Sequence, residues 1–389
     1  MSTTQDSTPP PNSTSSLDVS QPADLLTYLA NTPFASTRVE PLSGGYGNFI
    51  FRLHLVKPFA ASTGENLQTV ILKHAKPWAA SDKSFDLAIE RQATEATALK
   101  HVRSFLPVDA LATVPELYLH DPEAHIIIME DAGPSARNLK DLLRTVPLNE
   151  ETSRELGAAM GRFLAAVHVH GTADTALIEA TQNIEDARRI TAWITYGRLV
   201  DSLKEAGNGT TLVDPPLVGS EGVSETQLAE VKELVDSTIK KIYDARTDFT
   251  MGDFWTGNIV VRLTPNKAIE RIFVVDWEIS KPGLQFADFA QFAAEMNTLR
   301  RFHPEAETSV VTALSAYKEA YIQGKEVDEQ FLRSAASHLG AHMITISPRV
   351  ENWNGTKEQI REVVKEGVEY LLGGMNGDVQ WLNSSVVGS

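Results

Sequence analysis

Four oxygen-bearing side chains within a short stretch have the types and spacing that phosphoryl transfer needs. Asp253 and Asn258 lie in the segment GDFWTGN, and Asp276 and Glu278 follow in VVDWE. Mg²⁺ prefers carboxylate and amide oxygens together with phosphate, and phosphoryl transfer also uses a carboxylate beside the attacking hydroxyl. We therefore predict that Asp253 orients and deprotonates an acceptor hydroxyl, and that Asn258 and Asp276 hold Mg²⁺. Glu278 is predicted to contact a second metal directly or through water, although the spacing alone also allows two unrelated acidic turns.

A lysine at the end of an apolar run is the next candidate. Lys73 follows TVIL, which has the pattern of a buried strand. Burying an ammonium is costly unless a carboxylate pairs with it, and the next predicted helix offers Glu90 and Glu95. These two glutamates point in different directions on a helix, so only one is expected to meet Lys73. The pair would aim a cation at nucleotide phosphates, whereas a lysine that points to solvent is the alternative.

The glycine-rich segment SGGYGN, residues 43–48, opens into FIFRLHLV, which alternates like a strand. A dinucleotide-binding loop opens into a helix, and a Walker A loop needs Gly-Lys-Ser or Gly-Lys-Thr, so both are excluded. A glycine-rich turn between two strands instead lays backbone amides over ATP phosphates in kinase folds. An ordinary hairpin turn remains the alternative.

The order of the elements that should position these residues indicates an α+β fold with two lobes. Strands at 41–56, 68–75 and 125–133 and helices at 23–31 and 85–102 are expected first. Helices at 150–169, 182–205 and 225–245 follow, then a hairpin of strands 258–263 and 271–277, then helices from 286 to 372. We predict a disordered tail at 1–22, a nucleotide-binding N-lobe at 23–131, a C-lobe at 132–372 with the catalytic hairpin and acceptor site, and a flexible tail at 373–389.

Composition narrows the class of protein. The 389 residues carry a formal net charge of −16, which argues against nucleic acid as a partner. No apolar run approaches the length of a transmembrane helix, so no membrane partner is expected. The chain has no cysteine, which excludes disulfides and thiol catalysis. The N-terminal segment lacks the features of a secretory signal, and a cytoplasmic location is the simplest expectation.

Together these segments resemble the aminoglycoside phosphotransferase and choline kinase superfamily. GDFWTGN is similar to its catalytic loop, VVDWE to its metal-binding segment, and FADFAQF (286–292) to the acidic stretch that follows. LSGGYGNFIFRL, VILKHAKP and ERQATEATAL resemble its methylthioribose kinases and fungal 4-hydroxytryptamine kinases. The resemblance covers residues 23 to 372 and implies a two-lobed, protein-kinase-like fold, with ATP and Mg²⁺ as cofactors. Met251 departs from the pattern, because most of the superfamily has histidine there.

The resemblance also implies roles for individual residues. Asp288 is expected to brace the catalytic loop, and Glu95, rather than Glu90, is expected to pair with Lys73. Adenine is expected against backbone groups of the connector. The nucleotide-binding residues that follow are Ser43, Gly44, Gly45, Asn48, Lys73, Glu95, Met129, Glu130 and Asp131.

The resemblance implies a partner that is a small molecule with a hydroxyl group, bound by a monomer or homodimer. Hydroxylated amines such as 4-hydroxytryptamine are the first expectation, with methylthioribose-like sugars as the alternative. A non-catalytic nucleotide-binding pseudokinase is a further alternative, against which the intact set Lys73, Asp253, Asn258 and Asp276 counts. A protein kinase is disfavoured because D-F-G and A-P-E signatures are missing.

Other polar residues of the helical lobe are weaker candidates. His168 is expected to pack in the lobe core. The arginines at 300 and 301 are expected on a solvated face, with contact to an acceptor or a phosphate as the alternative. His338 and His342 share one helix face, and with Trp353 they form a possible acceptor pocket. The aromatic residues 254, 255 and 277 are candidate walls for the acceptor, although Trp277 is expected to alternate away from the metal face.

Overall fold

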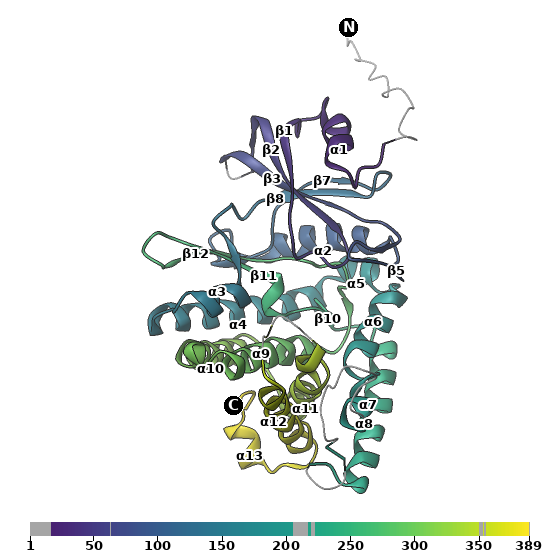
Figure 1. The fold of residues 1–389 in the computed structure, drawn as a ribbon, viewed down its shortest axis with the longest axis vertical. Helices are drawn as coiled ribbons and strands as arrows, with labels where there is room; N and C mark the ends of the chain where they lie inside the picture. The colour runs from purple at the N-terminus through teal and green to yellow at the C-terminus, as the bar shows by residue number, and fades with distance from the viewer. Residues whose placement is uncertain are drawn as a thin grey trace. The chain divides into compact units, whose positions relative to one another are not determined.

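The structure is a computed structural model that describes residues 17–62, 64–204, 217, 218, 222–349, 353 and 355–388. The chain forms two compact units. The smaller one runs to Ile89 and includes Tyr118–Asp131, and the larger one comprises Glu90–Leu117 and the chain from Ala132 onward. The smaller unit holds a sheet and the larger is mainly helical, which confirms the predicted α+β class (Figure 1). Residues 90–117, which we expected in the N-lobe, group with the larger unit.

A five-stranded sheet in the order β1-β2-β3-β8-β7 forms the smaller unit. The buried side chains of β2 alternate along the strand, as the sequence pattern predicts, and pack against Leu25 and Leu29 of the first helix. The elements of this unit are α1 (Pro22–Leu29), β1 (Ser36–Pro41), β2 (Phe49–Ala60), β3 (Asn66–His74), β4 (Trp78–Ala79), β5 (Asp82–Asp86), β7 (Leu117–Asp121) and β8 (Ile126–Glu130). The short pair β4–β5 takes up part of the helix expected at 85–102.

Two small sheets lie in the larger unit. One has the order β6-β12-β11-β9 and contains the expected hairpin, and the other is the antiparallel pair β10–β13. Their strands are β6 (Ala112–Thr113), β9 (Arg137–Asn138), β10 (Phe249–Thr250), β11 (Ile259–Leu263), β12 (Ile269–Val274) and β13 (Lys281–Pro282). A single 3₁₀ turn, η2 (Thr256–Asn258), leads into β11.

Helices make up most of the larger unit. Those before β10 are α2 (Arg91–Phe105), α3 (Leu139–Thr145), α4 (Glu150–Ala173), α5 (Thr175–Thr181), α6 (Glu185–Thr195), α7 (Leu199–Lys204) and α8 (Glu225–Asp244). Those after β13 are α9 (Gln285–Phe302), η3 (Pro304–Ala306), α10 (Glu307–Gly324), α11 (Glu329–Thr345), η4 (Ser347–Arg349), α12 (Lys357–Asn376) and α13 (Val379–Ser384). None of the described helices is long and apolar enough to cross a membrane.

Close helix packing fixes α9, the helix on which the candidate site depends. α9 packs against both α10 and α11, and α10 also runs beside α4 (Figure 1). Two glycines let α4 and α10 approach, because a Cβ at Gly157 would lie 1.9 Å from the carbonyl oxygen of Ala313. At Gly161 a Cβ would lie 2.2 Å from the carbonyl oxygen of Tyr317. Side chains larger than hydrogen are therefore excluded at both positions.

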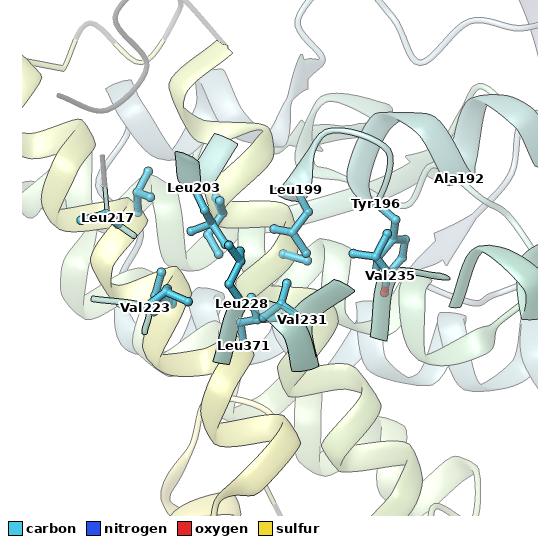
Figure 2. Close-up of a cluster of buried hydrophobic side chains, with 14 of the residues drawn as sticks. Ala192, Tyr196, Leu199, Leu203, Leu217, Val223, Leu228, Val231, Val235 and Leu371 are labelled. Carbon is cyan, nitrogen blue, oxygen red and sulfur yellow. The ribbon is translucent and has the colours of Figure 1, made fainter. Parts of the chain in front are cut away.

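A separate apolar cluster joins α6, α7 and α8 to α11 and α12. Figure 2 shows Leu199 and Leu203 near Leu228 and Val231, with Leu371 beside them. The helix expected at 182–205 is divided here into α6 and α7 by residues 196–198. This cluster packs α6, α7 and α8 against α11 and α12, and its described members include no candidate catalytic residue.

The two predicted tails fall partly within the described residues. The segment up to residue 16 of the expected disordered tail lies outside them. The segment expected to be a flexible tail at 373–389 differs from its prediction: it completes α12 and adds α13, with Asp378 as N-cap and Leu382 buried. Trp381 contacts the ring of Tyr370. Apolar contacts and a helix cap thus order a segment that the sequence pattern alone did not mark.

Candidate active site

The loop between β10 and β11 carries the first candidate residues and turns sharply at Gly252. Its φ of +86° is in the region that favours glycine. A Cβ there would lie 2.7 Å from the Nζ of Lys281 and 2.8 Å from the carbonyl oxygen of Ile279. We call residues 251–258 the catalytic loop. Both backbone conformation and space therefore require glycine immediately before Asp253.

Asp288, on the first turn of α9, braces this loop. Its carboxylate accepts hydrogen bonds from the backbone N–H of Met251 at 2.7 Å and of Gly252 at 2.9 Å. This confirms the bracing role expected for Asp288. Because the backbone of Met251 makes the contact, the loop keeps this anchor without a histidine at that position.

His168 supports Asp288 from the core of the helical unit. It is buried, its Nε2 lies 3.3 Å from the Asp288 carboxylate, and its Nδ1 lies 2.7 Å from the hydroxyl of Tyr321. Burial lowers the pKa of His168, and the hydrogen bond with Asp288 opposes this shift. Core packing was expected for this histidine and is confirmed; its contact with Asp288 was not foreseen.

The carboxylate of Asp253 is held at both oxygens. Oδ1 accepts a hydrogen bond from Nε2 of Gln291 at 3.0 Å, and Oδ2 accepts one from Nδ2 of Asn258 at 2.9 Å. Burial raises the pKa of Asp253 to about 6, the negative charge of Asp276 adds to the shift, and the two hydrogen bonds oppose it. A carboxylate with this pKa is mostly ionised at neutral pH and still basic enough to take a proton from a hydroxyl.

Asn258 and Asp276 are brought together by the hairpin. Ile259 pairs with Val274 in register, and the carbonyl oxygen of Asn258 accepts a hydrogen bond from the N–H of Val275 at 2.9 Å. Asp276 follows with a φ of +69°, a left-handed conformation that aspartate tolerates better than most residues. The charge of Asp276 acts directly on Asp253. Two neighbouring carboxylates and an amide are a donor set suited to Mg²⁺.

The described residues contain no group of three or more His, Asp or Glu side chains placed to hold a metal by themselves.

Glu278 has a partner that the sequence patterns did not indicate. Its Oε2 accepts a charge-assisted hydrogen bond from Nε of Arg91 at 3.0 Å, and the Arg91 side chain is 4% exposed. Arg91 is the first residue of α2, one turn before Glu95. Arg91 belongs to the segment ERQATEATAL, but nothing in that segment indicated a contact with Glu278. The metal role of Glu278 stays a prediction, and the carboxylate is shared with an arginine.

The nucleotide-binding candidates of the smaller unit lie on and beside its sheet. The turn from Ser43 to Asn48 joins β1 to β2, and Gly44 has a φ of +102°. A Cβ at Gly45 would lie 2.8 Å from the carbonyl oxygen of Asn48, so the turn is tightly closed. Lys73, on β3, is buried between its register partners Ile50 and Ile127.

The connector residues continue from β8. Met129 and Glu130 pair with β3 in the sheet. The carboxylate of Asp131 accepts hydrogen bonds from Nε and Nη2 of Arg52 at 2.6 and 3.0 Å and from the hydroxyl of Thr69 at 2.7 Å. Its side chain is thus committed to the sheet. Glu95 is buried on α2 of the other unit, and its pairing with Lys73 remains a prediction.

Two of the three candidate aromatic walls lie in the core instead. Phe254 is fully buried between the rings of Phe163 and Phe292. Trp277 is also fully buried, and its Nε1 donates to the carbonyl oxygen of Val274. The wall prediction is wrong for Phe254, because a bulky residue beside a reactive one can anchor a loop as readily as line a pocket. For Trp277, burial agrees with the expected alternation away from the metal face. Trp255 is partly exposed and remains available for an acceptor.

Lys281 is a residue near the catalytic loop that sequence reasoning missed. It is fully buried on β13, where it pairs with Thr250, and its Nζ donates to the carbonyl oxygen of Ile279 at 3.2 Å. Burial lowers the pKa of Lys281 to about 8, while the charges of Asp288 and Asp253 favour its protonated form. No spacing rule marks such a lysine, because its neighbours come from strand pairing.

The remaining candidates of the helical lobe are all engaged. Arg300 and Arg301 form ion pairs with Glu366, and Arg300 is largely buried, so the expected solvated face is wrong for Arg300. His338 and His342 are both buried on α11, as their spacing predicts. Nδ1 of His338 lies 2.8 Å from the Tyr196 hydroxyl, and Nε2 of His342 lies 2.8 Å from Oε1 of Glu295.

A family model described as the phosphotransferase enzyme family matches residues 38–328. The match extends over more than half of the chain, and the chain therefore belongs to this family. It is a small-molecule phosphotransferase, and the resemblance seen in its motifs is confirmed.

Curated relatives align over nearly the whole chain. The 4-hydroxytryptamine kinase of Psilocybe cyanescens is 28% identical over 362 residues, with 90% of this chain and 92% of the relative covered. That of Psilocybe cubensis is 28% identical, with 88% and 90% covered. The phosphotransferase FrzJ of Cladobotryum sp is 22% identical, with 94% of each covered.

Solved structures show weaker likeness. A microcompartment-associated aminopropanol kinase has a TM-score of 0.45 at 14% identity, with 90% of this chain and 94% of that chain covered. The amicoumacin kinase hAmiN in complex with AMP-PNP, Ca²⁺ and Ami has a TM-score of 0.43 at 12% identity, with 84% and 88% covered. At these values the structural likeness adds nothing to the family assignment.

Proposed function

We propose that the protein is an ATP- and Mg²⁺-dependent kinase that transfers the γ-phosphoryl group of ATP to a hydroxyl group of a small molecule. Asp253 accepts the hydroxyl proton, the hydroxyl oxygen bonds to the γ-phosphorus, and the bond to ADP breaks. The observation that carries this proposal is the carboxylate of Asp253, which Gln291 and Asn258 orient through a hydrogen bond to each of its two oxygens.

Asn258 and Asp276 are the residues that would hold Mg²⁺, with Glu278 beside them. When bound, Mg²⁺ would neutralise negative charge on the nucleotide phosphates. The chain's own contribution is to keep two carboxylates close enough that the charge of Asp276 raises the pKa of Asp253. Such mutual repulsion is relieved by a divalent cation, which supports the assignment.

For the nucleotide we propose the residues that the family resemblance implies. Backbone amides of the turn from Ser43 to Asn48 would cover the phosphates, and Lys73, paired with Glu95, would contact them. Adenine would meet the backbone of the connector at 129–131. The engagement of the Asp131 carboxylate with Arg52 and Thr69 supports a backbone-only role for this residue.

For the acceptor we propose a hydroxylated amine, with 4-hydroxytryptamine as substrate or close analogue. Support comes from the two relatives named 4-hydroxytryptamine kinase, which align over about nine-tenths of both chains. The net charge of −16 is compatible with a cationic acceptor. Methylthioribose-like sugars are the alternative acceptors.

The test incubates the purified chain with ATP and Mg²⁺ and a metabolite panel, read by mass spectrometry. The panel includes 4-hydroxytryptamine, its N-acetylated neutral counterpart and methylthioribose. Phosphorylation of the amine with a kcat/KM above that of both neutral compounds is expected. Faster turnover of methylthioribose would reject the amine while leaving the kinase assignment intact, and transfer to no compound would favour a non-catalytic nucleotide-binding protein.

A further inference from the structure

One face of α9 leads from the catalytic loop to a second group of charged and aromatic side chains. Asp288, Gln291 and Glu295 are three and four residues apart, so they lie along one side of the helix. Asp288 anchors the loop backbone and Gln291 donates to Asp253. Glu295 follows one turn later, which is about 6 Å further along the axis. The negative charge of Glu295 also contributes to the raised pKa of Asp253.

Only one of the two carboxylate oxygens of Glu295 has a hydrogen-bond partner among the described residues. The side chain is buried, with 3% of the residue exposed, and Oε1 accepts from Nε2 of His342 at 2.8 Å. Oε2 is buried and accepts no hydrogen bond from any residue that the structure describes. A buried carboxylate oxygen left in this way costs free energy unless a donor reaches it. No step of the phosphoryl transfer proposed above uses Glu295.

A cation already lies among the neighbouring aromatic rings. Nζ of Lys140 is 3.6 Å from the ring centroid of Trp353 and 6.0 Å from that of Trp255. Lys140 is buried, which lowers its pKa, and the charge of Glu295 favours its protonated form. We call Lys140, Trp255, Glu295, His342 and Trp353 the cation cluster.

The lysine leaves the cluster incompletely satisfied. Among the described residues, the ion-pair partner of Glu295 is His342, and Lys140 makes no direct ion pair with Glu295. Trp353 is buried, its ring stacks on Phe302 at 5.4 Å, and its Nε1 also has no hydrogen-bond partner within the described ranges. Lys140 therefore contacts the ring of Trp353 but leaves Oε2 of Glu295 without a hydrogen-bond donor.

We propose that the cation cluster is the subsite for the ammonium group of the acceptor, with Glu295 as the specificity-determining residue and Lys140 as an internal competitor. The inference rests on the proposed kinase function and adds the residues that select a cation. An ammonium N–H donates to Oε2 of Glu295, and the charge lies against the ring of Trp353 in place of the lysine. The hydroxyl then lies about one helix turn away, beside Asp253. The ligand class is a small hydroxylated amine with its two groups at that separation.

The test compares the wild-type protein with Glu295→Gln, Lys140→Met and the control Glu329→Gln on the exposed start of α11. Glutamine keeps the shape and an acceptor for His342 but removes the charge. For 4-hydroxytryptamine, Glu295→Gln is expected to lower kcat/KM by about 10- to 100-fold, the value of a charge-assisted hydrogen bond. For the N-acetylated counterpart the change stays within a few-fold. Lys140→Met is expected to raise kcat/KM for the amine only, and the control changes neither.

Binding of both compounds is also measured by calorimetry without ATP, with the melting temperature as a check of folding. This separates the two hypotheses: a wild-type protein that binds the amine through Glu295 but transfers no phosphate would contradict the kinase function and support the subsite. Equal losses for amine and neutral compound in Glu295→Gln, or no preference of the wild type for the amine in binding, would overturn the subsite. A weaker amine affinity in Lys140→Met would overturn the role of Lys140 as competitor.

Discussion

The catalytic loop and the cation cluster both involve side chains of α9, but they differ in whether their polar atoms have hydrogen-bond partners. In the loop, both carboxylate oxygens of Asp253 accept hydrogen bonds, and two backbone N–H groups donate to Asp288. In the cluster, Oε2 of Glu295 and Nε1 of Trp353 have no hydrogen-bond partner among the described residues. The first region is satisfied by the chain itself, whereas the second is not.

This difference separates chemistry from recognition. Reacting groups gain most when they are held in place before the substrate arrives, because no reorganisation is then needed during the reaction. A recognition site gains selectivity when its buried polar atoms are satisfied only by the correct ligand. Variants of the loop should therefore affect every acceptor alike, and variants of the cluster should distinguish acceptors.

The largest effect is expected from Asp253→Asn. The amide keeps one acceptor oxygen but cannot take the hydroxyl proton, so kcat should fall by about 10²- to 10⁴-fold for all acceptors. Calorimetry should show MgATP affinity within a few-fold of wild type, because Asp253 meets the acceptor rather than the nucleotide. If the variant kept more than about a tenth of the wild-type kcat, Asp253 would not be the general base.

The metal candidates should give the next largest effect and should differ from one another. Asp276→Asn is expected to raise the Mg²⁺ concentration for half-maximal activity by about 10- to 100-fold, a range that partners around metal sites commonly contribute. Glu278→Gln should raise it less, because the Glu278 carboxylate is already engaged by Arg91. Mg²⁺ titrations of both variants measure this order. The opposite order would make Glu278 the principal ligand.

A smaller effect is expected from Asp288→Asn, which alters the brace and leaves the reacting groups unchanged. The amide nitrogen would face one of the two backbone donors, at a cost of about 1–3 kcal/mol for the unsatisfied group. A lower melting temperature and a lower kcat for amine and neutral acceptors alike are expected. The matched control is Asp328→Asn, which keeps an N-cap that accepts from Phe331. An effect confined to one acceptor would contradict the bracing role.

The contrast between loop and cluster also explains what the sequence could predict. Asp253, Asn258, Asp276 and Asp288 were proposed because phosphoryl transfer constrains residue type and spacing within a continuous stretch. The structure connects Asp253 to Asn258 by a hydrogen bond and to Asp276 through their charges. Glu295 and Lys140 lie on different helices and share no motif, so only packing could bring them together.

The fold shows the same limit. Strands β2 and β3 and helices α4 and α8 were predicted because their apolar residues repeat with the period of the element. The edge strand β1 has a single buried residue, Val39, and gave no alternation to detect. The two-residue strands β10 and β13, which position the catalytic loop, exist only through pairing with each other.

A modest effect is expected in the nucleotide-binding residues. Glu95→Gln should raise the KM for ATP several-fold if Glu95 pairs with Lys73, because uniform binding of the nucleotide would be weakened. Glu90→Gln is the matched control. Residue 90 lies just before α2 and is expected to point in a different direction from Glu95, so it should not meet Lys73. Steady-state kinetics with varied ATP measure both. If Glu90→Gln had the larger effect, the assignment of Glu95 would be wrong.

The smallest effect on catalysis is expected from Lys281→Met. This change removes the buried ammonium group near the catalytic loop. Its burial lowers the pKa of Lys281 from an ordinary 10.5 to about 8. Between these values the unfolded chain binds more protons at this residue than the folded chain, so its contribution to stability rises with pH through the window from 8 to 10.5. Below the window both states are protonated, and above it both are neutral, so the contribution is constant there. The melting temperature of the wild type relative to Lys281→Met should therefore rise as pH increases across this window and stay level below it.

Lys240→Met, which removes an exposed lysine of α8, is the control and should give no such rise. Parallel curves for wild type and Lys281→Met would contradict the lowered pKa of Lys281.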